Sequence, residues 1–244
     1  MTTYPVNARV PAVAALLCLT ASGCAVTTHG TAMPVAAPPS TTAETLPSLM
    51  LPAADVGSAL SGSGLSGSGL SGTEVVVTRD VSAPWDDSAH LTESTGCLAL
   101  AGAAQRAVYA DSDWTALHGQ VLREPPTAQW AHFATQAVVL FPTAEAAGDF
   151  FARSRQSWAG CADREMTYPQ QLVGDQVWSI GPVTVDRDML AVSRTQRSPE
   201  RWSCQRALTV RGNTAVDVEA CDIDGPTSAA TVIARAITDR LPST

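Results

Sequence analysis

The chain has 244 residues and a formal net charge of −8, and all 15 of its basic residues are arginines. Affinity for nucleic acid depends largely on neutralising phosphates, so an acidic chain without a basic stripe is not expected to bind nucleic acid. For the same reason, the chain is not expected to lie on an anionic membrane by charge alone.

The N-terminus has the pattern of an exported lipoprotein. Val10–Ala21 (VPAVAALLCLTA) is apolar but too short to cross a hydrocarbon core of about 30 Å, so residues 1–23 are predicted to be a signal peptide. The segment ends in ASGC, which resembles a bacterial lipobox except that Ala21 replaces the usual larger aliphatic residue. The resemblance implies cleavage before Cys24 and a lipid anchor there, with acyl chains such as palmitate, on the extracytoplasmic side of the cell membrane. The alternative is an ordinary secretory signal with an incidental cysteine.

Residues 24–45 are predicted to be a disordered tether. From Ala25 onward they are mainly threonine, alanine and proline, and cannot bury enough apolar surface to offset the entropy of ordering. Residues 46–244 are expected to form the folded part, which at about 200 residues is one domain with a substantial core. Within it, Ser61–Gly72 (SGSGLSGSGLSG) repeats one short unit, with too few copies for a solenoid, which favours a lengthened flexible loop.

Hydrophobic spacing predicts helices at Pro52–Leu60, Leu98–Tyr109, Thr143–Gly160 and Pro226–Leu241. In the third helix, Thr143 can cap the first turn, and one face carries Ala147, Phe150, Phe151, Ser154 and Trp158. In the last helix, the residues expected to face inward are Val232, Ile233, Ala236, Ile237 and Leu241.

Strands are predicted at Glu74–Thr78, Thr115–Leu122, His132–Leu140, Gln176–Ile180, Met189–Thr195, Trp202–Val210 and Thr214–Asp222. These strands cluster between the helices and are joined by links of hairpin length. The pattern predicts an α+β fold, a single domain with a mainly antiparallel β-sheet packed by helices.

The cysteines can be accounted for by export. Cys18 leaves with the signal peptide and Cys24 carries lipid, so two disulfides are expected among Cys97, Cys161, Cys204 and Cys221. Gly212-Asn213 reads as a two-residue hairpin turn, and pairing Arg211 with Thr214 places Cys204 opposite Cys221. That position is a non-hydrogen-bonded pair with Cα atoms about 4.5 Å apart, where a disulfide is sterically reasonable. The register therefore selects Cys204–Cys221 and leaves Cys97–Cys161.

The same register sorts the two faces of the hairpin. One face is apolar and should meet the core, with Ala207, Val216, Val218 and Ala220. The other places Arg206 opposite Glu219, with Asp217 one pair further, and also carries the disulfide and Trp202. This polar face is either a solvated surface with an ordinary ion pair or the floor of a binding cleft.

Several segments together resemble one known family. They are Cys97 with the Ala-rich segment that follows it, DSDWTALHGQ, TQAVVLFPTAEAAGDFFARSRQSWAGC, QVWSIGPV and WSCQRALTVRGNTAVDVEAC. They are similar to the extracellular sensor domain of the mycobacterial Ser/Thr protein kinase PknH, which also occurs alone in secreted proteins and lipoproteins. The resemblance runs from about Leu46 to Leu241. It implies an α+β domain, two disulfides paired as above, and a broad cleft for an unidentified extracytoplasmic ligand. Unlike the kinase, this chain is expected to have neither a kinase domain nor a transmembrane helix, so neither phosphotransfer nor direct signalling is expected.

General motifs of catalysis are absent from the sequence, including GxSxG, HExxH, CxxC and a Walker-type loop. His118 and His132 lie in neighbouring strands but lack the spacing of a known metal site, so no catalytic residue, metal or cofactor is expected. We expect a lipid-anchored sensor that binds a ligand or protein of the cell envelope, with contact residues Trp114, Gln136, Trp202, Arg206 and Glu219. The alternatives are an envelope enzyme with an unrecognised site, or a protein-interaction module with an exposed apolar patch.

Overall fold

The computed structural model describes residues 41–62, 72–85, 97–100, 102–125, 131–168, 175–198, 202–223, 225 and 227–242. The predicted signal peptide, Cys24, most of the tether and most of the SGSGL repeat lie outside these residues. Regular structure begins with a 3-10 turn, η1 (Ala43–Thr45), followed by the short helix α1 (Leu46–Leu49). The first turn therefore lies just before the predicted start of the domain at Leu46.

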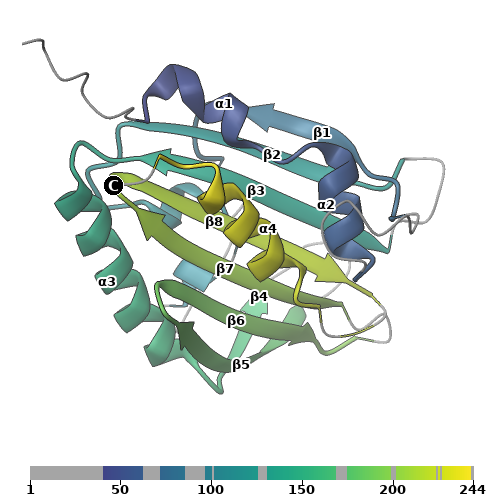
Figure 1. The fold of residues 1–244 in the computed structure, drawn as a ribbon. Helices are drawn as coiled ribbons and strands as arrows, with labels where there is room; N and C mark the ends of the chain where they lie inside the picture. The colour runs from purple at the N-terminus through teal and green to yellow at the C-terminus, as the bar shows by residue number, and fades with distance from the viewer. Residues whose placement is uncertain are drawn as a thin grey trace, which may run out of the picture. The chain divides into compact units, whose positions relative to one another are not determined.

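The described strands form a single antiparallel sheet of eight strands, in the order β1-β2-β3-β8-β7-β6-β5-β4 (Figure 1). Their bounds are Val76–Val81 for β1, Ala116–Arg123 for β2, His132–Leu140 for β3, Glu165–Tyr168 for β4, Gln176–Asp186 for β5, Met189–Gln196 for β6, Ser203–Arg211 for β7 and Thr214–Asp222 for β8. The predicted α+β fold with an antiparallel sheet is confirmed, and the β7–β8 hairpin lies at the centre of the sheet.

Two features of the sheet were missed. The short strand β4 was not predicted, and β5 continues well beyond its predicted end at Ile180. The register of β5 against β6 shifts between Ile180 and Val183, where Gly181 and Pro182 lie. A bulge tolerates a glycine and a proline that would interrupt regular pairing, so the strand resumes after them.

One face of the sheet carries the helices α1, α2 (Ala53–Leu60) and α4 (Ala229–Asp239), and Figure 1 shows α4 lying across β7 and β8. The core beneath them contains the apolar residues predicted for this face of the hairpin, Ala207, Val216, Val218 and Ala220. α4 begins later than Pro226; Ile233, Ile237 and Leu241 are buried as expected, whereas Val232 and Ala236 are only half-buried.

The opposite face is covered by α3 (Ala144–Cys161) and by the irregular segment 97–109. Thr143 caps α3 as predicted, because its hydroxyl accepts from the N–H of Ala146 at 3.1 Å. Of the residues predicted on the inward face of α3, Ala147, Phe150, Ser154 and Trp158 are buried, whereas Phe151 is only half-buried at its edge. The Cys97–Cys161 disulfide joins the last residue of α3 to the start of the irregular segment.

The helix predicted at Leu98–Tyr109 is wrong. The described residues of the segment form only two 3-10 turns, η3 (Leu98–Leu100) and η4 (Arg106–Val108). Its backbone groups bind partners from elsewhere in the fold. Two of its carbonyls accept from arginines of the sheet, and the Ala104 carbonyl accepts from the N–H of Trp85 at 3.0 Å. Ala104 also has a positive φ of 58°, which a helix does not allow. These long-range bonds override the helical preference of the alanines.

Both predicted disulfides are present. Cys97–Cys161 has a Cα–Cα distance of 5.7 Å, and Cys204–Cys221 has one of 4.0 Å. The hairpin register is also as predicted, because Arg211 pairs with Thr214 and Cys204 with Cys221. A short-range turn argument therefore predicts the longer-range pairing of the other two cysteines.

Candidate functional site

Two neighbouring rows of side chains cross the sheet on the face covered by segment 97–109. Cross-strand partners share a face, so the pairings define each row. The first row consists of Arg79, Val121, Thr135, Glu219 and Arg206. The second consists of Arg123, Phe133, Cys221, Cys204 and Arg194. The charged residues of this face thus come from strands that are distant in the sequence.

A pocket of about 420 Å³ lies over these rows. Its lining residues on the strands are Thr78, Arg79, Val121, Arg123, Phe133, Thr135, Arg194 and Glu219. Trp85, Ala103 and Gln105 complete the wall. They are held together because the N–H of Arg106 donates to the Trp85 carbonyl at 2.8 Å, and Trp85 forms an isolated parallel bridge with Gln105. The wall opposite the sheet therefore depends on the irregular segment.

An ion pair between Arg194 and Glu219 lies at one side of the pocket. Arg194 also donates at 2.8 Å to both the Leu100 carbonyl and the Tyr168 hydroxyl, and its guanidinium lies 4.9 Å from the ring centroid of Trp178. Burial raises the pKa of Glu219 above its ordinary value, while the charges of Arg194 and Arg206 oppose that rise. The Glu219 carboxylate is thus bound by Arg194, whose guanidinium also contacts Leu100, Tyr168 and Trp178.

A second ion pair, Arg206–Asp217, is buried beside the first. Arg206 binds both oxygens of Asp217, at 3.0 and 2.9 Å, and the Tyr109 hydroxyl donates to Asp217 at 2.6 Å. Burial, followed by the charge of Asp217, raises the pKa of Tyr109 well above its ordinary value. Arg206 is 3% exposed and Asp217 0%, so the interpretation of this face as a solvated surface is wrong. Segment 97–109 and Trp158 of α3 exclude the water.

The predicted contact residues do not all meet at the pocket. Glu219 lines it, and Arg206 is its neighbour in the first row but lies deeper. Trp202 is half-buried and packs on Phe133, which lines the pocket, with ring centroids 5.8 Å apart. Trp114 is half-buried against the cluster that contains α3, and it is not a lining residue.

Gln136 is on the other face of the sheet and is therefore not brought to the pocket. Its side chain is fully buried; it accepts from the Leu51 N–H and donates to the Leu51 carbonyl, both at 3.0 Å. It also donates to Gln120 at 3.0 Å. Gln136 thus holds the link between α1 and α2 against β3, where an apolar side chain would leave two backbone groups without partners.

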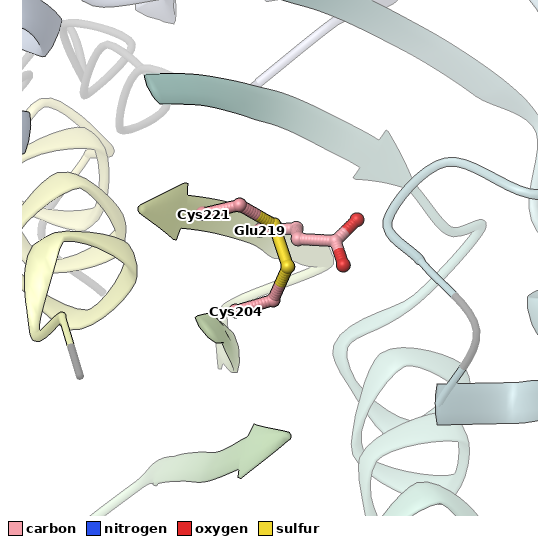
Figure 2. Close-up of side chains that lie close together, drawn as sticks. All are labelled: Cys204, Glu219 and Cys221. Atoms are coloured by element: carbon pink, nitrogen blue, oxygen red, sulfur yellow. A yellow bond between two sulfur atoms is a disulfide. The ribbon is translucent and has the colours of Figure 1, made fainter. Parts of the chain in front are cut away.

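Figure 2 shows Glu219 beside the Cys204–Cys221 disulfide. The two sulfurs and a carboxylate oxygen lie within 4.8 Å of one another, but disulfide sulfurs are not the thiolates that bind metals. The two strand histidines are also apart: His118 lies 3.5 Å from Asp80, whereas His132 contacts Glu124 at 3.0 Å. The described residues therefore bring no histidine to the cysteine cluster.

Most pocket residues were missed by the sequence analysis, including Arg79, Arg123, Thr135 and Arg194. The hairpin register would have reached two of them if extended to the adjoining strands, since Thr135 pairs with Glu219 and Arg194 with Cys204. That extension requires knowing which strands flank the hairpin, and nothing in the local sequence encodes this order.

Comparison with known proteins relates the chain to extracellular domains. Residues 41–240 match the model of a family described as "PknH-like extracellular domain". The Ser/Thr protein kinases PknH of Mycobacterium bovis and Mycobacterium tuberculosis are 35% identical over 136 residues, which are 55% of this chain and 22% and 21% of the kinases. The match thus spans about a fifth of the length of these curated relatives.

A solved structure extends the comparison over most of the chain. It is the crystal structure of the extracellular domain of PknH from Mycobacterium tuberculosis, with a TM-score of 0.73 at 29% identity. The alignment covers 84% of this chain and 98% of that domain. Within the residues described for this chain, no helix is both long enough and apolar enough to span a lipid bilayer.

Proposed function

We propose, since the chain belongs to the family of PknH-like extracellular domains, that it is an extracytoplasmic sensor domain that binds a ligand of the cell envelope in the pocket over the β-sheet. A lipid on Cys24 would hold it at the outer side of the cell membrane. The single observation that carries this proposal is the pocket of about 420 Å³ whose floor crosses the sheet.

The composition of the pocket supports ligand binding. Sites for small molecules combine apolar or aromatic surface with a few convergent polar groups. Here Trp85 and Phe133 supply aromatic surface, while Thr78, Thr135 and Gln105 supply hydroxyl and amide groups. The pocket wall is not merely an exposed loop, because Arg194 and Arg206 of the two ion pairs donate hydrogen bonds to carbonyls of segment 97–109 and so hold it on the sheet. Such anchoring reduces the entropy that binding would otherwise cost.

We also propose that binding occurs without chemical turnover. Acid–base catalysis on a substrate commonly uses two carboxylates or a carboxylate with a histidine. Among the described residues that line the pocket, Glu219 is the only carboxylate and none is a histidine. The carboxylate of Glu219 is already engaged in an ion pair with Arg194. An envelope enzyme remains the competing hypothesis, and release of altered product from a bound envelope compound would favour it.

A protein-interaction module receives less support from the described surface. The exposed large apolar side chains among the described residues are Val76 and Val77 on β1 and Val185 on β5. Five strands separate β1 from β5 in the sheet, so these residues do not form one patch. A dedicated docking face would present a larger contiguous apolar area.

The experiment is native mass spectrometry of the full chain after exposure to a cell-envelope extract. Wild-type protein should retain a species of discrete added mass, and Thr78→Trp should lose it by filling the pocket. Thr184→Trp is a matched control, because Thr78 and Thr184 are both exposed strand residues whose hydroxyls donate to a neighbouring strand, at 3.2 and 3.3 Å. If Thr78→Trp retained the species, the ligand would bind elsewhere. If the wild-type protein were seen in its unliganded form alone, the proposal would be contradicted.

A further inference from the structure

We propose that the ligand of this pocket is an uncharged, polyhydroxylated molecule about the size of one sugar ring, held between the hydroxyls of Thr78 and Thr135. This inference rests on the proposed function, since it names the class of ligand that the same pocket takes. A sugar or another ring-sized polyol fits this description.

The charged side chains that line the pocket already have partners within the chain. The carboxylate of Glu219 is bound by Arg194 and accepts a hydrogen bond from the N–H of Ala103. The other lining arginines among the described residues, Arg79 and Arg123, are engaged as well. A charged ligand would have to replace some of these interactions and would leave a charge without its partner. A neutral ligand leaves them all in place.

Thr135 is a polar residue of the pocket floor whose hydroxyl remains available to a ligand. It lies in the first row between Val121 and Glu219, and is 5% exposed. No described residue forms a hydrogen bond with this hydroxyl. Leaving a buried hydroxyl without a partner is unfavourable, so a ligand group that binds it gains affinity. A ligand hydroxyl can both donate to it and accept from it.

Thr78 provides a second hydroxyl, at the edge of the pocket on β1. It donates its proton to the Val121 carbonyl at 3.2 Å, so it can accept a hydrogen bond from a ligand. Val121 pairs with Thr135 on the next strand, so β2 separates the two hydroxyls, which places them roughly 10 Å apart at two strand spacings. Hydrogen bonds of about 2.8 Å to each hydroxyl leave about 4–5 Å between the ligand oxygens. Hydroxyls on opposite sides of a six-membered ring span this distance.

The rest of the lining suits the carbon face of such a ring. Phe133 and Trp85 contribute aromatic surface, and Ala103 and Val121 contribute aliphatic surface. A sugar ring carries C–H groups on its faces and hydroxyls around its rim, so it can use the apolar and the polar lining together. The pocket volume of about 420 Å³ lies toward the lower end of the range for small-molecule sites, about 300–1,000 Å³. The pocket therefore suits a single ring, either free or at the end of a longer chain.

The test uses the full chain with Cys24→Ser, so that no lipid of its own is attached, and native mass spectrometry after exposure to a cell-envelope extract. One portion of the extract is oxidised with sodium periodate, which cleaves vicinal diols. A matched portion receives sodium iodate, which does not, and both are quenched with ethylene glycol before the protein is added. The captured species should disappear with the periodate-treated portion and persist with the iodate-treated one. It should also be captured from extract that has passed through anion-exchange and cation-exchange resins, because an uncharged ligand is not retained by either.

Substitutions at Thr135 test the contact in the pocket floor. Thr135→Val removes the hydroxyl at nearly constant volume and should lower capture from a limiting amount of extract by about tenfold. Thr135→Ser keeps the hydroxyl and should capture far more than Thr135→Val. Thr184→Val makes the same change at an exposed strand residue that does not line the pocket, and should leave capture unchanged.

A free sugar and the end of a larger glycan share this chemistry. Ultrafiltration of the extract separates the two sources, because only a free sugar is captured from the filtrate. Capture that survives periodate, capture that is lost after either resin, or equal capture by Thr135→Val and Thr184→Val would overturn the inference. In each of these cases the proposed function stands if Thr78→Trp still blocks capture. If the untreated extract yields no captured species, the proposed function itself fails, and the inference fails with it.

Discussion

Arg206 lies directly opposite Glu219 across the β7–β8 pair, yet its guanidinium binds Asp217, two residues away on β8. Glu219 is bound instead by Arg194 of β6. The two ion pairs therefore cross the sheet obliquely, and each cation also donates to a carbonyl of segment 97–109, Arg206 to Ala99 and Arg194 to Leu100. Charges buried in the sheet thus hold the irregular segment that walls the pocket.

Breaking the deeper of these pairs should destabilise the fold. Arg206→Met or Asp217→Asn leaves a buried charge without its partner, and the free energy of unfolding should fall by about 3–5 kcal/mol in urea titrations. The double variant Arg206→Met/Asp217→Leu should lose less than either single variant, because no uncompensated charge remains. Arg197→Met removes an exposed ion pair with Glu165 and should change stability by under about 1 kcal/mol. Equal effects of Arg206→Met and Arg197→Met would show that burial of the pair does not matter.

Tyr109 should make the fold sensitive to alkali. Its pKa in the folded state is raised well above the ordinary value of about 10, chiefly by burial and then by Asp217. Above about pH 10 the unfolded chain loses this proton while the folded chain keeps it, so the free energy of unfolding falls as the pH rises. Tyr109→Phe removes the proton and should flatten the decline by up to about 1.4 kcal/mol per pH unit, as measured by urea titrations at about pH 9 to 11. If the free energy of unfolding fell equally steeply with pH in Tyr109→Phe and in the wild type, Tyr109 would not be the source of the alkali sensitivity.

The sequence predicted the features that depend on interactions between residues close in the chain, and it failed where distant residues interact. The β7–β8 register and its disulfide depend on one turn, and Thr143 and the apolar face of α3 depend on helical spacing; all three were predicted correctly. Leu98–Tyr109 was predicted as a helix because its alanines favour one, whereas two of its carbonyls accept hydrogen bonds from arginines more than ninety residues away. Local propensity cannot anticipate such partners.

Loss of the Cys97–Cys161 disulfide should affect both stability and the pocket. The bridge spans a sequence separation of 64, against 17 for Cys204–Cys221, and chain entropy predicts about 4 and about 3 kcal/mol of stabilisation. Cys97→Ala/Cys161→Ala should also release one end of the pocket wall, so amides of residues 102–109 should exchange faster with deuterium. Cys204→Ala/Cys221→Ala is the control. Faster exchange of residues 102–109 in Cys204→Ala/Cys221→Ala, without faster exchange in Cys97→Ala/Cys161→Ala, would contradict the role given to Cys97–Cys161.

The lipid anchor makes a separate prediction, on residues outside the described structure. If Cys24 carries lipid, Cys24→Ser should move the protein from the membrane fraction to the soluble extracytoplasmic fraction. Cys18→Ser, within the predicted signal peptide, should leave the distribution unchanged. Immunoblots of fractionated cells measure both variants, and retention of Cys24→Ser on membranes would show that the lipobox is not used.

Gln136 and Thr135 are adjacent on β3 but face opposite sides of the sheet, and this separates structural from binding roles. Gln136→Leu leaves the buried N–H and carbonyl of Leu51 without their partner, so the free energy of unfolding should fall by about 2–3 kcal/mol. Capture of an envelope species should be unchanged at temperatures where the variant is folded, because the pocket lies on the other face. Thr135→Val alters the pocket floor and should show the reverse, weakened capture with a smaller loss of stability. Urea titration and native mass spectrometry of both variants test this, and loss of capture in Gln136→Leu alone would return Gln136 to the binding site.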